Sequence, residues 1–200
     1  MKNIIAILII IFVISACDSK RFLQKISLEE EITNVIQIRN EIAYLPDAKG
    51  PFTGKYEEYY STNGQKKSET NYIDGKKNGR FTSWYENGKK ESEENYEEGK
   101  QDGLFTNWYE SGQKKSETNY KNGKVDGLYS LWYENGQKKT EINYKDGELN
   151  GLFTWWYENG QKMSETNYVD GKVNGLTIEW DENGQKKSET NNNRFNADET

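Results

Sequence analysis

The chain has 200 residues and a net charge of −6, and only 32% of its residues are hydrophobic. Residues 1–17 hold 14 of these, and the rest of the chain is about 27% apolar, which excludes a conventional thick core. The absence of His and the single Cys exclude His-based acid–base catalysis, a disulfide within the chain and a Cys-rich zinc site.

Residues 1–16 are predicted to be a lipoprotein signal peptide. Lys2 gives it a positive start, and residues 4–14 form an apolar run of 11 residues, which is short for a membrane span. The residues Ile-Ser-Ala-Cys at 14–17 resemble the lipobox of bacterial lipoproteins, which implies cleavage before Cys17 and acylation of that residue. We therefore expect a lipid anchor in a bacterial cell envelope, in the inner or the outer membrane. An uncleaved membrane anchor is the alternative.

Residues 17–50 are expected to form a tether and an irregular first unit. Residues 19–31 are mostly polar and charged. The apolar residues Val35, Ile36 and Ile38, and then residues 42–44, flank a polar Arg-Asn pair, which predicts two short strands joined by a turn. A helix over residues 28–42 is the competing interpretation. An atypical unit is common at the end of a repeat array, where it caps the stack.

Residues 51–190 repeat themselves with a period of 24 residues, in about six units. The segments 103–126, 127–150 and 151–174 are near copies, and glycine recurs at three positions of each unit. A period of this length indicates a repeat array. The composition of 6 Trp, 14 Tyr and 7 Phe argues against disorder in this region. Residues 191–200 are polar, and we expect a disordered tail there.

Each unit is predicted to be a β-hairpin. An aromatic stretch such as LFTWWY precedes the sequence Glu-Asn-Gly-Gln, and an extended polar stretch such as KKSETNY follows it. Asn-Gly favours the type I′ turn, so we expect the tight turn at this point and a looser connection where glycines flank residues 148–150. The expected fold is all-β, an extended twisted antiparallel sheet of tandem hairpins that is nearly a single layer.

The unit resembles the MORN repeat, with the pattern Tyr-x-x-Gly-Lys-x-x-Gly followed by an aromatic strand and a Gly turn. With Pro-Phe-Thr-Gly at 51–54, the wider pattern is similar to the bacterial MORN-variant repeat of the YwqK-like antitoxin family, over roughly residues 40–190. The resemblance implies a protein-binding or scaffolding module rather than an enzyme. The antitoxin relation implies neutralisation of a toxin protein, which a lipid anchor would turn into an immunity-like role in the envelope.

Strand alternation sorts the aromatic side chains onto two faces. On one face, we expect a structural ladder of tryptophans: Trp84, Trp108, Trp132, Trp156 and Trp180. The opposite face carries columns of Phe and Tyr, and there the units differ at one position, where Leu131 and Trp155 are apolar neighbours. We hypothesise that these two form an exposed partner-binding patch, to which the neighbouring rings contribute. The rings are Phe105, Tyr129, Phe153, Tyr133 and Tyr157. Local packing is the alternative.

Other functions are weighed against protein binding. Glycan binding through the exposed aromatic ladders is the first alternative, and a structural surface spacer is the second. The Ser and Glu residues recur as near-equivalent copies on a polar strand, so we predict no catalytic residue. Turn chemistry accounts for the Asp and Asn residues before Gly, so we predict no metal and no cofactor. The acidic balance argues against nucleic acid, and membrane contact is expected only through the lipidated Cys17.

Overall fold

The computed structural model describes residues 36–192, and all regular secondary structure in this part of the chain is β-strand. The chain divides into two units after Pro51. The signal peptide, Cys17 and the first part of the tether lie outside the described residues, as does the tail from residue 193. The all-β prediction is confirmed.

The first unit contains a small antiparallel hairpin. Strands β1 (Gln37–Arg39) and β2 (Ile42–Tyr44) pair through a turn in which Asn40 and Glu41 have φ angles of 51° and 66°. Two central residues in the left-handed region define a type I′ turn. The predicted pair of short strands is therefore confirmed, and the competing helix does not form over residues 36–42.

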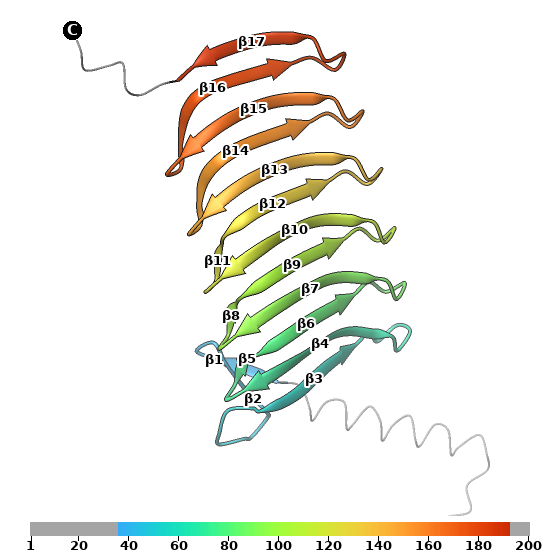
Figure 1. The fold of residues 1–200 in the computed structure, drawn as a ribbon. Coiled ribbons are helices and arrows are strands. Elements are labelled where there is room, and N and C mark those ends of the chain that lie inside the picture. Colours follow the sequence, from blue (N-terminus) through green and yellow to red (C-terminus); the bar gives the residue numbers. More distant parts are fainter. Residues whose placement is uncertain (1–35, 193–200) are drawn as a thin grey trace, which may run out of the picture. The chain divides into compact units, whose positions relative to one another are not determined.

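The second unit is one antiparallel sheet of 15 strands. Its strands follow one another in chain order, so the sheet is a ladder in which each repeat pairs only with its neighbours (Figure 1). Its strands are β3 (Gly54–Tyr59), β4 (Lys66–Ile73), β5 (Lys76–Lys77), β6 (Gly79–Trp84), β7 (Lys90–Glu97), β8 (Lys100–Gln101), β9 (Gly103–Trp108), β10 (Lys114–Lys121), β11 (Lys124–Val125), β12 (Gly127–Trp132), β13 (Lys138–Lys145), β14 (Glu148–Trp156), β15 (Lys162–Val169), β16 (Lys172–Trp180) and β17 (Lys186–Asn191).

The two turns of the repeat have the opposite character to the prediction. At Glu-Asn-Gly-Gln only the glycine has positive φ, as at Gly136 with 85°, and Gly136 N–H donates to the Tyr133 carbonyl. This is a three-residue loop, a type I turn followed by a left-handed glycine. The type I′ turn instead lies in the connection predicted to be looser, where Asn122 and Gly123 both have positive φ and Lys121 pairs with Lys124. The prediction was wrong because Asn-Gly fits both turn types.

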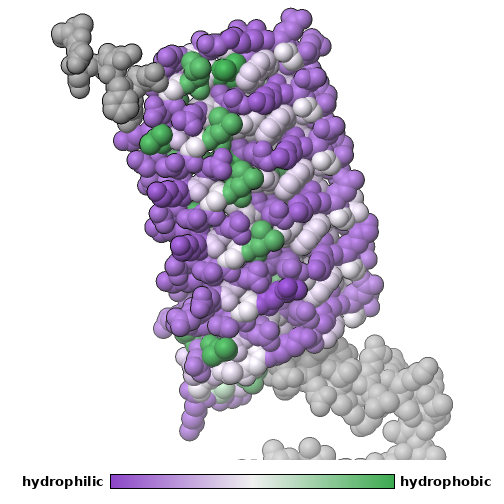
Figure 2. Space-filling view, viewed as in Figure 1, coloured by the Kyte–Doolittle hydropathy of each residue, from purple (hydrophilic) through white to green (hydrophobic). Residues whose placement is uncertain are grey.

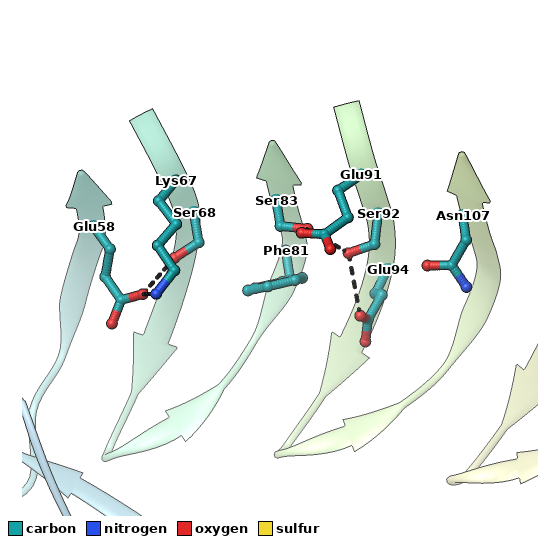
Figure 3. A pocket seen from close by; sticks show the side chains of 9 residues that line it. All are labelled: Glu58, Lys67, Ser68, Phe81, Ser83, Glu91, Ser92, Glu94 and Asn107. Atoms are coloured by element: carbon teal, nitrogen blue, oxygen red, sulfur yellow. Dashed lines mark hydrogen bonds and ion pairs between the residues drawn. The ribbon is translucent and has the colours of Figure 1, made fainter. Parts of the chain in front are cut away.

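Each hairpin also contains a β-bulge that the sequence analysis did not predict. In the β6–β7 pair, Ser83 faces Ser92 and Trp84 faces Lys90, so Glu91 is an extra residue. The bulge places the side chain of the extra residue beside that of the next residue, as Figure 3 shows for Lys67 with Ser68 and for Glu91 with Ser92. The extra residues are Lys67, Glu91, Lys115, Lys139, Met163 and Lys187.

The sheet has almost no buried core. Among the described hydrophobic residues only Ala43 and Tyr72 are buried, and no large side chain in this part of the chain is fully enclosed. The buried positions are mostly small hydroxyl residues, such as Thr82, Thr106 and Thr154. The expected single-layer arrangement is therefore confirmed, and the stability of the sheet has to come from contacts between neighbouring repeats.

The face that carries the tryptophan column, here called the Trp face, is covered by lysines. The Nζ atom of Lys90 lies 5.6 Å from the ring centroid of Trp108 in the next repeat and 2.6 Å from the Glu93 carboxylate. The same arrangement recurs along the sheet, with Lys114 over Trp132. In the view of Figure 2 the hydrophobic side chains form a row that hydrophilic or neutral side chains interrupt over most of its length, and they lie side by side only near the β16–β17 end, a pattern that needs no binding partner to explain it.

Candidate functional site

The opposite face, here called the Phe/Tyr face, carries one row of side chains in which the repeats differ. The row crosses every strand of the ladder except the two-residue strands β5, β8 and β11, because each of its members is the register partner of the next. In each hairpin we call the strand before the three-residue loop, such as β6, the outgoing strand, and the strand after it, such as β7, the return strand. The row always has Ser or Thr on the return strands, whereas its residues on the outgoing strands vary. In chain order the variable positions are Glu58, Ser83, Asn107, Leu131, Trp155 and Glu179.

The row becomes apolar between β12 and β15. Leu131 and Trp155 lie on either side of Thr140, which is the register partner of both. The Trp155 ring contacts the Phe153 ring edge-on at a centroid distance of 5.6 Å, and 44% of Trp155 is exposed. The structure thus brings together the two residues on which the hypothesis rests, with the indole accessible to a partner.

Two further apolar residues join this region that sequence reasoning missed. Ile142 is the register partner of both Tyr129 and Phe153, and the corresponding residues of the other return strands are Thr or Glu. Met163 is the extra residue of the bulge next to Ser164, the register partner of Trp155. We call Leu131, Ile142, Phe153, Trp155 and Met163 the apolar patch. Ile142 and Met163 could have been noticed in the sequence as apolar exceptions in otherwise polar return strands.

The other candidate rings take part in contacts along the sheet. Phe105 packs on Tyr120 at 5.9 Å, and Tyr129 packs on Tyr144 at 6.5 Å. These contacts add a tyrosine column to the Phe/Tyr face that sequence reasoning missed: Tyr72, Tyr96, Tyr120, Tyr144 and Tyr168. Each tyrosine of this column is the register partner of a glycine in the outgoing strand.

Tyr133 and Tyr157, both predicted as partner-binding residues, also connect repeats. The Tyr133 hydroxyl donates to the Trp156 carbonyl and the Tyr157 hydroxyl donates to the Trp180 carbonyl, each at 2.9 Å. Tyr85 and Tyr109 make the equivalent bonds. Their rings remain partly exposed beside the variable row, so they can border the apolar patch while their hydroxyls hold the ladder together.

At the other end of the row the same face is hollowed and acidic (Figure 3). The hollow has a volume of about 360 Å³ and lies where Ser83 leaves the row unfilled between Ser68 and Ser92. We call it the acidic hollow. Phe81 and Asn107 also line it, and its charged residues are Glu58, Glu91, Glu94 and Lys67.

The carboxylates of the hollow differ in the number of hydrogen bonds that they accept. Glu94 accepts from the Tyr96 hydroxyl at 2.5 Å and from Gln101 at 2.9 Å, and burial, together with this carboxylate, raises the pKa of Tyr96. Glu91 accepts from the Ser83 hydroxyl at 3.1 Å. Lys77 lies over the Phe81 ring at 4.3 Å, where burial lowers the pKa of its ammonium group.

No group of three or more His, Cys, Asp or Glu in residues 36–192 is arranged to hold a metal ion. The same part of the chain contains no helix long and apolar enough to cross a membrane.

Comparison with known proteins gives a repeat family. The family model described as MORN repeat variant matches residues 77–98, 101–122, 125–146, 149–170 and 173–191, which together make up more than half of the chain. Each match spans all or nearly all of one outgoing strand, the three-residue loop and the whole of the following return strand. No curated protein matches the chain.

Proposed function

The chain belongs to the MORN repeat variant family, and from this premise we propose that its array is a protein-binding module that meets its partner on the Phe/Tyr face. Repeats of this family are a non-catalytic module and are generally associated with binding to membranes and proteins. The proposal adds the surface that carries the contact and the residues at its centre, which are Leu131 and Trp155.

The observation that carries the proposal is a coincidence of three independent columns. The variable row, the return-strand column that contains Ile142 and the column of bulge residues are polar or charged in most repeats, yet all three become apolar between β12 and β15. The fold does not require this, since Ser83, Glu94 and Glu91 occupy the equivalent positions in an earlier repeat. A group of apolar side chains around an exposed Trp is typical of a protein-interaction site, and here Trp155 is 44% exposed while the other four are half-buried.

The composition of the patch favours a protein over a glycan. Sugars stack on flat rings and need polar side chains for their hydroxyl groups, whereas Leu131, Ile142 and Met163 offer only aliphatic or thioether contact. Such side chains adapt to the apolar side chains of another protein. Glycan binding is therefore an alternative outcome of the experiment below rather than a second proposal.

We also propose that acylation of Cys17 anchors the module in a bacterial cell envelope, in an immunity-like role in which it captures a toxin protein. The support is the signal-peptide pattern of residues 1–16, and two or more acyl chains suffice for stable anchoring. We expect the full chain to incorporate a labelled fatty acid in bacterial cells and the Cys17→Ser variant to incorporate none. Equal labelling of the wild type and the variant, or no labelling of either, would contradict the lipid anchor.

The binding proposal is tested by capture from the natural cell envelope with the full chain as bait. The test variant is Leu131→Ser with Trp155→Ser. The control variant is Leu128→Ser with Leu152→Ser, two residues of the Trp face that are 44% and 43% exposed, as Trp155 is. We expect one protein to be retained by the wild type and by the control, and its affinity to fall at least about tenfold in the test variant.

Two results would overturn this proposal. Equal retention by the test and control variants would exclude the apolar patch as the binding site. Retention of polysaccharide without protein would replace the proposal by glycan binding. Circular dichroism of each variant shows whether it keeps the β-structure of the wild type.

A further inference from the structure

The Phe/Tyr face offers a partner two different contacts in one row of side chains. Ser83 in the acidic hollow and Trp155 in the apolar patch occupy the same position of the unit, three repeats apart, with Asn107 and Leu131 between them. A partner that lies along this row therefore meets the acidic hollow and the apolar patch at a fixed separation.

The acidic hollow fits the side chain of a basic residue. Serine hydroxyls and the Phe81 ring line its floor, against which an alkyl stem can pack, and three carboxylates surround it. Lys67 lies 3.9 Å from Glu58, and Lys77 lies over Phe81. A carboxylate has about four lone-pair sites, so the bond from Ser83 leaves Glu91 with capacity to accept from an ammonium or guanidinium group.

The spacing of the repeats selects the conformation of the partner. Two strands per repeat correspond to a step of about 9.6 Å along the row. A polyproline II segment advances about 9.3 Å in each turn of three residues, so it presents one side chain to every repeat. The side-chain period of about 6.7 Å in a β-strand and the pitch of about 5.4 Å in an α-helix do not match this step.

We propose that the partner presents a polyproline II segment in which apolar side chains contact Trp155 and Leu131 and a basic side chain enters the acidic hollow at Ser83. Three repeats separate Ser83 from Trp155, so the basic side chain lies about nine residues from the first apolar one. Such a segment matches the row in three ways: in charge at the acidic hollow, in polarity at the apolar patch and in pitch along the row. This inference rests on the proposed function, to which it adds the chemistry of the partner.

The test uses fluorescent proline-rich peptides and the full chain, with affinity measured by fluorescence anisotropy. The first peptide carries leucine at positions 1 and 4 and lysine at position 10, and a second has the reverse order to allow either chain direction. Each has a control peptide in which the lysine is moved by one residue, which turns it about a third of a turn away from the sheet. We call the two peptides with the lysine at its designed position the in-register peptides. One of them is expected to bind about fivefold more tightly than its control, because one exposed charge pair changes an affinity by about this factor.

Variants of the protein locate this preference. Glu58→Gln with Glu91→Gln is expected to abolish it, whereas Glu110→Gln with Glu134→Gln, which removes the same charge from exposed turns, is expected to preserve it. Leu131→Ser with Trp155→Ser is expected to weaken the binding of all the peptides. Equal binding of in-register and control peptides, or no binding of any peptide, would overturn the inference. The capture experiment decides the proposed function independently, because it does not depend on the form of the partner.

Discussion

Raising the pH above about 10 is expected to unfold the repeat array, whereas its stability should change little between about pH 7 and pH 9. In eight tyrosines burial is the main cause that raises the pKa of the phenol above its usual value of 10.0. They are Tyr60, Tyr72, Tyr85, Tyr96, Tyr109, Tyr120, Tyr129 and Tyr133. A phenol with a raised pKa in the folded state stabilises that state below the pKa of the unfolded chain, and this contribution is lost as the pH rises.

The measurement is urea unfolding at several pH values, followed by tryptophan fluorescence and by the ultraviolet absorbance of tyrosinate. We expect the urea midpoint to fall above about pH 10, and tyrosinate to appear together with unfolding. The Tyr129→Phe variant should show a smaller pH dependence, because it removes one group whose pKa burial raises. Tyrosinate that forms in a chain with an unchanged urea midpoint would contradict this prediction.

The sequence predicts the ladder well because the ladder depends on local pattern. The 24-residue period, the alternation of side chains and the aromatic outgoing strands lead to the observed sheet and its two faces. Each of these signals lies within one unit and is repeated in the next. Because the units repeat the same signals, a strand that is ambiguous in one unit can be assigned from its copies in the others.

The parts that were not predicted depend on pairing between strands. The stretch Lys-Glu-Ser at 90–92 looks like regular alternation, and only its pairing with β6 makes Glu91 an extra residue and turns its side chain toward Ser83. The acidic hollow and the contribution of Met163 to the apolar patch follow from such bulges. Leu131 and Trp155 were identified because they differ from their copies, which is a signal that the sequence itself contains.

Deletion of residues 127–150 is expected to leave a folded array that is one repeat shorter. The deletion removes one whole unit, so β10 meets β14 in place of β12. The register is preserved, because Ser116 pairs with Leu131 as Thr140 pairs with Trp155. The Tyr109 hydroxyl, which donates to the Trp132 carbonyl, then meets the equivalent carbonyl of Trp156. At the usual stability per residue, the loss is about 1–4 kcal/mol in the free energy of unfolding.

Deletion of residues 127–138 removes half a unit and serves as the control. It places the polar return strand β13 where the outgoing strand β12 was, so every later strand runs in the opposite direction to its counterpart. The Tyr109 hydroxyl then loses the Trp132 carbonyl to which it donates, and the Trp156 carbonyl loses the Tyr133 hydroxyl. We expect the strands after β10 to lose their structure, as measured by circular dichroism and by hydrogen exchange. A quasi-one-dimensional ladder requires that contacts between repeats set the register. Equal folding of both deletion variants would show that they do not.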